Sequence, residues 1–260
     1  MIYQNILAEI KEQILYITIN REAKLNALNK ATLAELALAI ADATANSEVR
    51  GVLLTGAGEK AFVAGADISE FQDYTLSEGK ELGRMGQQNV FDAIANCAKP
   101  FVAAINGFAL GGGLELAMAC HIRIAADNAK LGLPEVTLGL IPGYGGTQRL
   151  TQLIGKGRAM EMITTADMIT AEKAAQIGLV NEVVPQAALI ARAEEILGKI
   201  KQRAPLAVAS AIKSINASLN PTINGFEVEI DEFGKCFNTE DFKEGVAAFL
   251  EKRKPTFKGK

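Results

Sequence analysis

The segment Asn106-Gly107-Phe108-Ala109-Leu110-Gly111-Gly112-Gly113-Leu114-Glu115 carries the strongest structural signal of the chain. It follows residues 101–105, a short apolar run typical of a buried strand, and it leads into residues 114–120, which have the composition of a buried helix. Consecutive glycines at such a junction let the backbone approach a ligand closely, and the first amides of the helix have no partner within it. The segment is therefore either a tight turn that needs positive φ or an oxyanion site made of backbone N–H groups.

Strands and helices alternate on both sides of this segment. Residues 14–20 show the period-two alternation of a strand, with residues 5–10 as a hairpin partner, and residues 21–29 are turn-like. Further predicted elements are helices over residues 32–45, 77–95 and 114–120 and strands over residues 51–55, 101–105 and 122–125. This alternation is typical of an α/β domain with parallel strand pairs.

The chain becomes helical after Pro134. Helices are predicted over residues 155–164, 171–176, 187–202, 205–219, 222–237 and 240–252, and only residues 179–184 are predicted to be extended. No low-complexity linker separates the two regions. We therefore expect the helical part to pack on the α/β core or to be exchanged between copies of it.

Composition excludes several classes of protein. The chain has 260 residues, of which 49% are hydrophobic, so it can bury a large core and intrinsic disorder is excluded as its main state. With 27 Lys and Arg against 30 Asp and Glu, it lacks the basic excess of a nucleic-acid-binding domain. Five of these basic residues lie in Lys252–Lys260, which contains no acid and suits a small phosphate-bearing ligand that is bound locally.

No apolar run approaches the ~18 residues that a membrane-spanning helix needs. Residues 1–5 lack the pattern of a signal or transit peptide, so we expect a mature cytoplasmic chain with no membrane partner. Cys97, Cys120 and Cys236 are far apart and odd in number, which favours free thiols over disulfides or a metal site.

Three other segments contain glycines that could place backbone amides against a ligand. Residues 56–61 match the relaxed dinucleotide pattern G-x-G-x-x-A, but residues 62–67 are predicted to be extended rather than helical. We therefore favour a plain strand-to-loop connection there over a dinucleotide site. The other two segments are residues 61–68 and residues 142–149, and the second of these is typical of a turn into a helix.

Two carboxylates stand in apolar surroundings. Glu115 lies on the first turn of an apolar helix, and Glu135 lies in the apolar stretch of residues 131–136. The helix dipole could explain the first and a surface turn the second. Alternatively, two carboxylates in a dry site can act as proton acceptor and proton donor, as the addition of water to a double bond requires. His121, the only histidine, has no partner at metal-ligand spacing, which favours a structural role.

Taken together, these segments resemble the crotonase, or enoyl-CoA hydratase, family over essentially the whole chain. The matching residues are Asn20-Arg21, Asn26-Ala27-Leu28, Leu54-Thr55-Gly56, Ala64-Gly65-Ala66-Asp67-Ile68, Asn106-Gly107 to Glu115, Pro134-Glu135, Pro142-Gly143-Tyr144-Gly145-Gly146-Thr147 and Phe249-Leu250-Glu251-Lys252-Arg253. The resemblance implies a spiral of ββα units over residues 1–195. It also implies a helical C-terminal region, residues 196–260, that takes part in trimer contacts, with trimers often pairing into hexamers.

The resemblance also implies a reaction site. In the family, two backbone N–H groups hold the thioester carbonyl of an acyl-CoA, and these correspond here to Ala66 and Gly112. Both hydratase glutamates are present as Glu115 and Glu135, with Glu135 as proton donor and Glu115 as the base that orients water. No metal or cofactor is implied, because coenzyme A is part of the substrate.

The expected CoA contacts are less specific. They are Arg21, Lys24, Leu25, Ala64, Gly65, Asp67, Ile68, Gly111, Phe249 and Lys252, the last two from the same subunit or a neighbouring one. Glu22 stands where the family commonly has Pro, and His121 stands where it often has Asp. We expect the change at His121 to affect packing or polar pairing at the helix end, with little effect on the chemistry. Candidates for the acyl pocket are Met85, Phe91, Leu138, Ile141 and Phe237.

The leading prediction is a short-chain enoyl-CoA hydratase, a carbon–oxygen lyase of fatty-acid β-oxidation or a related acyl-CoA route. An enoyl-CoA isomerase of the same family needs a single carboxylate, and the pair of Glu115 and Glu135 disfavours it. A crotonase-like module that binds RNA is disfavoured by the same pair and by the acidic balance of the chain. An NAD-dependent oxidoreductase would rest only on the match at residues 56–61.

Overall fold

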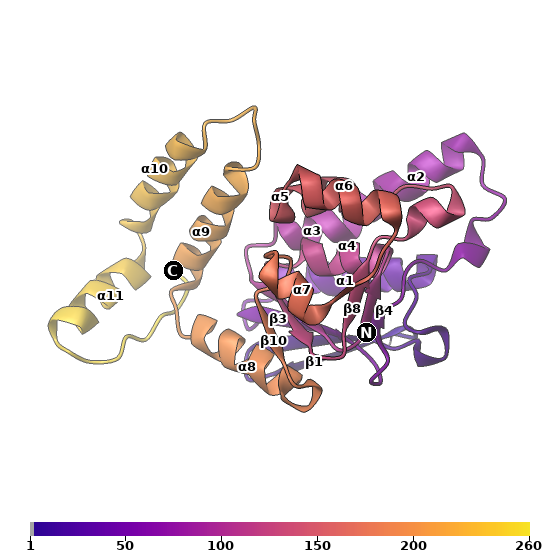
Figure 1. Ribbon diagram of the computed structural model, residues 1–260. Coiled ribbons are helices and arrows are strands. Elements are labelled where there is room, and N and C mark those ends of the chain that lie inside the picture. The colour runs from indigo at the N-terminus through magenta and orange to yellow at the C-terminus, as the bar shows by residue number, and fades with distance from the viewer. Residues whose placement is uncertain (1–2) are drawn as a thin grey trace.

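Two β-sheets form the framework of the protein in a computed structural model, which describes residues 3–260 (Figure 1). The larger sheet has the strand order β1-β2-β3-β5-β7-β10, and the smaller has the order β4-β6-β8-β9. The strands are β1 (Ile6–Lys11), β2 (Ile14–Ile19), β3 (Gly51–Gly56), β4 (Ala61–Val63), β5 (Phe101–Ile105), β6 (Phe108–Leu110), β7 (Ile122–Ala126), β8 (Lys130–Gly132), β9 (Ile169–Thr170) and β10 (Glu182–Val184). Residues 1–5 are predicted to lack the pattern of a signal or transit peptide. The first two of them lie outside the described residues.

Successive strands are shared between the two sheets. β3, β5 and β7 lie side by side and parallel in the larger sheet, whereas β4, β6 and β8, which directly follow them in sequence, are parallel neighbours in the smaller one. A helix follows each pair, which gives three ββα units. The α/β fold class and the spiral of ββα units predicted from the sequence are therefore confirmed.

The helices agree with the predicted ranges to within a few residues, with two differences: residues 146–154 form a helix where the sequence predicted only a turn into a helix over residues 142–149, and one predicted helix is interrupted. They are α1 (Lys30–Ala45), α2 (Leu76–Gly86), α3 (Asp92–Ala95), α4 (Gly112–Ala119), α5 (Gly146–Ile154), α6 (Lys156–Thr165), α7 (Ala171–Gln176), α8 (Leu189–Ile200), α9 (Pro205–Ala217), α10 (Gly225–Cys236) and α11 (Glu240–Leu250). The helix predicted over residues 77–95 is divided, because a π-helix (Gln87–Phe91) joins α2 to α3.

The larger sheet is apolar on both faces, as expected of strands that are buried between layers. Leu54 and Phe101 face one hydrophobic cluster, and Leu53 and Val102 face a second cluster on the opposite side. α8 covers that second side with Leu189, Ala193 and Leu197. The predicted boundary between the core and the C-terminal region, at residues 195 and 196, falls inside α8. Because α8 packs on the sheet, any boundary between the two regions would lie after this helix. The division into two regions stays a prediction.

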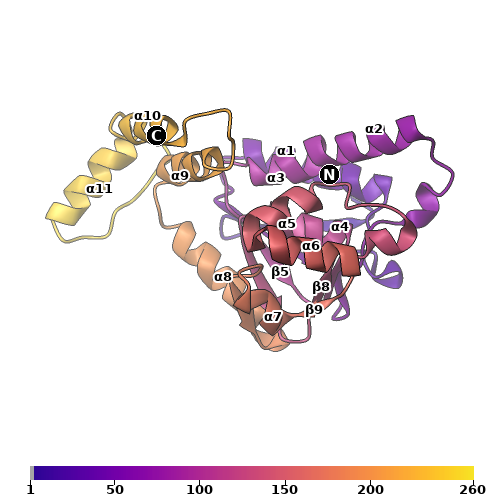
Figure 2. The same cartoon turned by 45° about the horizontal axis from the view of Figure 1, so that its top comes forward.

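The three C-terminal helices α9, α10 and α11, which we call the C-terminal arm, extend away from the two sheets (Figures 1 and 2). The end of the chain folds back on the arm, where the backbone amides of Lys258 and Gly259 donate to the carboxylate of Asp241. Large apolar side chains stay exposed on the arm, among them Ile215, Phe226, Ile230, Phe233, Phe249 and Leu250. Within residues 3–260, no helix is long and apolar enough to span a membrane.

Candidate active site

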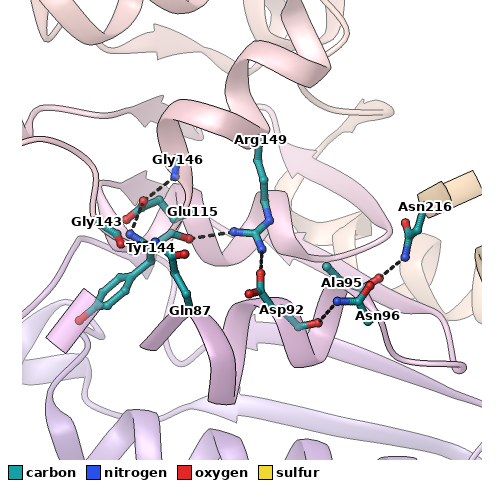
Figure 3. A network of polar contacts seen from close by, with 10 residues as sticks. All are labelled: Gln87, Asp92, Ala95, Asn96, Glu115, Gly143, Tyr144, Gly146, Arg149 and Asn216. Atoms are coloured by element: carbon teal, nitrogen blue, oxygen red, sulfur yellow. Dashed lines mark hydrogen bonds and ion pairs between the residues drawn. The ribbon is translucent and has the colours of Figure 1, made fainter. Parts of the chain in front are cut away.

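Glu115 lies at the centre of the candidate site. α4 begins directly after β6, and all of its residues are buried, so the carboxylate enters a dry environment with only 1% of the residue exposed. Oε1 of Glu115 accepts hydrogen bonds from the amides of Tyr144 (2.8 Å) and Gly146 (2.7 Å) (Figure 3). A Cβ on Gly146 would lie 2.8 Å from this oxygen, so the close approach of the second amide requires glycine.

The environment of Glu115 moves its ionisation toward neutral pH. Burial, with a further contribution from the charge of Glu135, raises the pKa of Glu115 to about 7. The amides of Gly146 and Tyr144 and the charge of Arg149 act in the opposite direction, because they stabilise the carboxylate form. A carboxylate that is buried and yet ionises near pH 7 suits general acid–base chemistry.

Glu135 begins a 3₁₀ helix (Glu135–Leu138) that follows β8. Its Oε1 would lie 3.1 Å from a Cβ on Gly111, where φ is +51°, so glycine is favoured at position 111 for two reasons. Burial raises the pKa of Glu135, and its buried Oε2 has no hydrogen-bond partner within residues 3–260. This oxygen is therefore available for proton transfer.

The structure brings the two carboxylates together. β7 and β8 return the chain from α4 to Glu135, whose carboxylate lies against Gly111 and close enough to Glu115 for its charge to raise the pKa of Glu115. Twenty residues of sequence separate them, so their proximity is a product of the fold. Their roles as base and proton donor stay predictions.

The amides of Ala66 and Gly112 are the two that are predicted to form an oxyanion site. Leu28 forms an isolated parallel β-bridge to Ala66. The N–H of Leu28 donates to the carbonyl of Gly65, and the carbonyl of Leu28 accepts from the N–H of Asp67. The N–H of Ala66 therefore points away from Leu28. Gly112 is the first residue of α4, where an amide has no intrahelical partner. In the part of the chain that the structure describes, neither amide donates a hydrogen bond.

The segments that carry these two amides are neighbours. The Cα of Gly65 would lie 3.8 Å from a Cβ on Gly111, and a Cβ on Gly65 would lie 3.6 Å from the carbonyl oxygen of Leu110. Two unpaired donors on adjacent segments can bind a single oxygen. This arrangement favours an oxyanion site over the tight turn that the glycines alone left possible.

The loop of residues 142–146, which holds Glu115, is itself clamped by side chains (Figure 3). Nη1 of Arg149 donates to the carbonyl of Tyr144 (2.8 Å), and Nη2 pairs with Asp92 of α3. Nε2 of Gln87 donates to the carbonyl of Gly143 (2.8 Å). Sequence reasoning missed this clamp, because only the presence of Arg149 in the glycine-rich segment hinted at it.

The first loop joins the predicted CoA-binding segment. Arg21 forms an ion pair with Asp67 (3.0 Å), and the amide of Ala64 donates to the carbonyl of Leu25 (3.0 Å). The exposed side chains of Lys24 and Ile68 lie on the same two segments. The predicted contacts in residues 21–25 and 64–68 are therefore brought together.

Glu22 departs from the family pattern without disrupting this first loop. It begins a 3₁₀ helix (Glu22–Lys24), and its carboxylate lies against Gly58, where a Cβ would be 2.2 Å from Oε1. Gly58 has a φ of +73°, which favours glycine at this position in any case.

Two predicted CoA contacts do not approach the site within one chain. Phe249 lies on α11 and Lys252 just beyond it, in the arm and far from α4 (Figure 1). The candidate acyl-pocket residue Phe237 also lies in the arm, packed against Phe233 and Phe242. A single chain therefore does not assemble these three residues with Glu115.

The other acyl-pocket candidates fall into two groups. Phe91 is buried and stacks on Tyr144 with 4.8 Å between ring centroids, whereas Met85 lies exposed on α2. Leu138 and Ile141 are exposed in the segment after Glu135. Sequence reasoning missed Tyr144, whose ring packs beside Gly112.

The segment of residues 56–61 connects β3 to β4 and opens no helix. Its carbonyl oxygens accept hydrogen bonds from two buried side chains, Asn26 and Asn106. Both observations confirm the predicted strand connection and contradict a dinucleotide site.

His121 has a structural contact. Its Nδ1 accepts a hydrogen bond from the amide of Phe101 (2.9 Å), and burial lowers the pKa of the imidazole to about 4. Nδ1 is thus paired at this helix end, whereas Nε2 is buried with no hydrogen-bond partner within residues 3–260. Cys97, Cys120 and Cys236 are free thiols. Over residues 3–260, no three His, Cys, Asp or Glu side chains are grouped to hold a metal ion.

Comparison with known proteins agrees with this geometry. The sequence profile described as enoyl-CoA hydratase/isomerase matches residues 9–260. The chain is 47% identical over 258 residues to the crotonyl-CoA hydratase of Syntrophomonas wolfei, covering 99% of both chains. It is 49% identical over 251 residues to the short-chain-enoyl-CoA hydratase of Clostridium acetobutylicum, covering 96% of both.

A crystal structure of enoyl-CoA hydratase from Bacillus anthracis superposes with a TM-score of 0.93 at 41% identity, covering 99% of this chain and 100% of that one. Both the profile match and these identities extend over nearly the whole sequence. The chain therefore belongs to the enoyl-CoA hydratase/isomerase family.

Proposed function

We propose that the chain is an enoyl-CoA hydratase that adds water reversibly to short-chain trans-2-enoyl-CoA thioesters and gives 3-hydroxyacyl-CoA. The observation that carries the proposal is the pairing of buried Glu115 with half-buried Glu135, whose Oε2 is covered, beside two backbone amides that have no hydrogen-bond partner within residues 3–260. The names of the Syntrophomonas and Clostridium relatives support a short acyl chain.

The amides of Ala66 and Gly112 would bind the carbonyl oxygen of the thioester. When water attacks the conjugated double bond, negative charge moves onto this oxygen as the enolate forms. Fixed donors therefore stabilise the transition state more than the ground state. Loss of one such donor typically costs ~10²–10³ in rate.

The two glutamates would divide the proton transfers. Glu115, whose Oε1 is held by two amides, accepts a proton from water as the water oxygen bonds to C3. Glu135 donates a proton to C2, and the proton gained by Glu115 returns to Glu135 before the next turnover. Water supplies both the hydroxyl group and the proton that the product gains, so the reaction needs no cofactor.

The first loop and residues 64–68 would bind the CoA portion, with Arg21 and Lys24 supplying positive charge for its phosphates. We propose that the apolar arm forms a trimer, or a hexamer of two trimers, in which Phe249 and Lys252 complete the CoA site. A large exposed apolar patch of this kind usually marks an interface. The cytoplasmic location stays a prediction that cell fractionation can test.

The test is to mix the purified protein with crotonyl-CoA and follow the loss of absorbance of the conjugated thioester. Glu115→Gln and Glu135→Gln keep the shape of each side chain but remove its acid–base function. We expect each to lower kcat by at least ~100-fold, with a much smaller change in CoA binding. Near-normal turnover in either variant would contradict the two-carboxylate assignment.

Product analysis separates the alternatives. Formation of 3-hydroxybutyryl-CoA supports the hydratase. Migration of a double bond in a trans-3-enoyl-CoA, without hydration of crotonyl-CoA, would point to the isomerase. A salt-sensitive shift of RNA without hydratase activity would point to a binding module.

A further inference from the structure

The arm bonds to α3 through the side-chain amide of Asn216 on α9. Nδ2 of Asn216 donates to the carbonyl oxygen of Ala95, the last residue of α3 (2.7 Å; Figure 3). Within residues 3–260, this is the only hydrogen bond between residues 205–260 and residues 3–203. Carbonyl groups at the end of a helix have no partner within it, so Asn216 supplies a bond that α3 cannot make itself. The mechanism described above does not use this contact.

α3 is a single helical turn that connects this contact to the clamp on the loop of residues 142–146. The backbone amide and the side-chain amide of Asn96 both donate to the carbonyl of Asp92 (2.9 Å each), and the carboxylate of Asp92 pairs with Arg149. The buried side chain of Ile94 anchors the helix in the core. Because α3 has only four residues, a shift of Ala95 at one end also displaces Asp92 at the other.

The segment that ends in α3 holds the loop of residues 142–146 at two carbonyl groups. Nε2 of Gln87, in the π-helix before α3, donates to the carbonyl of Gly143 (2.8 Å). Nη1 of Arg149 donates to the carbonyl of Tyr144 (2.8 Å). The carbonyl of Gly143 and the N–H of Tyr144 belong to one planar peptide group. Gln87 therefore fixes the orientation of an amide that the proposed base uses.

The carboxylate of Glu115 accepts hydrogen bonds from two amides of this loop, those of Tyr144 and Gly146. The charged groups that act on Glu115 are Glu135, which raises its pKa, and Arg149, which lowers it. Withdrawal of the two amides would remove bonds that favour the carboxylate form, so the pKa of Glu115 would rise further. A shift of the loop therefore changes both the position and the basicity of the proposed base.

We infer that Asn216 is a positioning residue for the proposed reaction: its bond to Ala95 fixes α3, and α3 fixes the loop whose amides hold Glu115. The inference rests on the proposed function. It gives the arm a role within its own chain besides assembly. The orientation of the arm would set the geometry of a base that the arm does not touch.

The experiment measures kcat and KM for crotonyl-CoA in Asn216→Leu, which keeps the size of the side chain but removes the donor. We expect kcat to fall about fivefold, the scale of one hydrogen bond, with KM little changed because the proposed CoA contacts stay intact. The low-pH limb of the kcat/KM profile should move to higher pH, because a base with a raised pKa ionises later. A merely structural role for Asn216 would lower the melting temperature and leave this limb in place.

Ser210→Ala is the matched control on the same helix. Oγ of Ser210 donates to Glu232 (2.9 Å), so this substitution removes a hydrogen bond inside the arm and none to α3. It should leave kcat and the pH profile unchanged. All variants are compared at protein concentrations where sedimentation shows the same assembly as for the original protein.

A double variant tests whether Asn216 acts through α3. Asp92→Asn removes the charge that pairs with Arg149 and should lower kcat about tenfold. Asp92→Asn combined with Asn216→Leu should be no slower than Asp92→Asn alone, because both changes release the same loop. Multiplication of the two single effects would overturn the inference.

Asn216→Ala is measured in parallel and guards against a folding defect of the leucine variant. An unchanged kcat and pH profile in the folded Asn216 variants, with crotonyl-CoA still hydrated, would overturn the inference and leave the proposed function intact. A failure of the original protein to hydrate any enoyl-CoA would instead overturn the proposed function.

Discussion

Glu115 and Phe249 each lie in an environment that is unusual for the side chain. The charged side chain is buried, and the aromatic side chain is exposed. The carboxylate of Glu115 is buried at the start of α4, where only 1% of the residue is exposed, whereas the phenyl ring of Phe249 on α11 is 83% exposed. Around α4, the sheets, helices and loop of residues 142–146 bury every residue of the helix. On the arm, apolar rings face outward along α10 and α11.

This difference in burial indicates what each region is suited to do. A buried carboxylate is costly unless it is hydrogen-bonded, and at Glu115 two amides reduce that cost while keeping the acid reactive. An exposed aromatic side chain costs little in an isolated chain but gains free energy when a partner covers it. The core around α4 thus supplies chemistry, and the arm is suited to assembly.

The largest expected effect concerns the pH dependence of stability. Because burial raises the pKa of Glu115 to about 7, above its usual 4.5, the folded chain binds the proton more tightly than the unfolded chain does. The contribution of protonated Glu115 to the unfolding free energy is fully present below pH 4.5 and is lost as the pH rises through 7. Relative to the original protein, Glu115→Gln should therefore gain on the order of 3 kcal/mol in unfolding free energy between pH 4 and pH 8.

Glu244 on α11 is the matched control from the arm. Its hydrogen bonds to Arg253 lower the pKa of Glu244 to about 2, so its stabilising contribution is complete above pH 4.5 and is lost only as the pH falls toward 2. Urea unfolding of Glu244→Gln should differ from the original protein by a constant amount from pH 5 to pH 8. A constant difference for Glu115→Gln as well would contradict the contrast between the two regions.

A second prediction applies the same substitution, glycine to alanine, in both regions. A Cβ on Gly113 of α4 would lie 2.0 Å from the carbonyl oxygen of Val63, so Gly113→Ala should destabilise the protein by roughly 1–3 kcal/mol. Gly234 of α10 has nothing within 4 Å of the same position. Gly234→Ala should stabilise the protein by about 0.5–1 kcal/mol, because alanine favours the helix.

Thermal unfolding of both glycine variants, with the original chain as reference, tests this pair. A loss at Gly113 no larger than the change at Gly234 would contradict the tight packing of α4. A loss at Gly234 would sharpen the comparison, since it would mean that a neighbouring subunit closes over α10.

The smallest expected effect concerns assembly. Phe226→Asp on α10 should weaken self-association about tenfold, or 1.4 kcal/mol, because the charge would be buried at the proposed subunit contact. Leu76→Asp on α2 is the control, since Leu76 is also an exposed apolar residue but lies outside the arm. Sedimentation at several concentrations measures both. A single monomeric species for the original chain at micromolar concentration would contradict an assembly role for the arm.

Much of the fold could be predicted because its larger elements carry long periodic patterns. β3 and β5 are runs of five or six mostly apolar residues, β7 is apolar except for Arg123, and the helices of the arm have helical spacing. β6, β8 and β9 are only two or three residues long, too short for any periodicity, and they were missed. β6 lies inside the glycine-rich segment that predicts a turn, so the smaller sheet could not be derived from local sequence.

The site was predictable only in part for a related reason. Glu115 stands out in sequence because the rest of its helix is apolar, but its proximity to Glu135 depends on how β7 and β8 return the chain. Arg149 and Tyr144 act through the shape of the loop of residues 142–146, which no local pattern specifies. Phe249 lies far from Glu115 in a single chain, so its predicted contact with CoA depends on assembly.

The side chain of Asn106 has a consequence for the order in which the chain can fold. Its amide nitrogen donates to the carbonyl oxygens of Gly56 (3.0 Å) and Gly58 (2.7 Å), which belong to the preceding ββα unit. Gln186 in turn donates to the carbonyl oxygen of Glu59 (3.0 Å), from still later in the chain. During synthesis the first unit therefore emerges before the side chains that bind its loop carbonyls in the folded protein. Each turn of the spiral is completed by the next, which makes folding a cooperative event of the whole core rather than of one unit at a time.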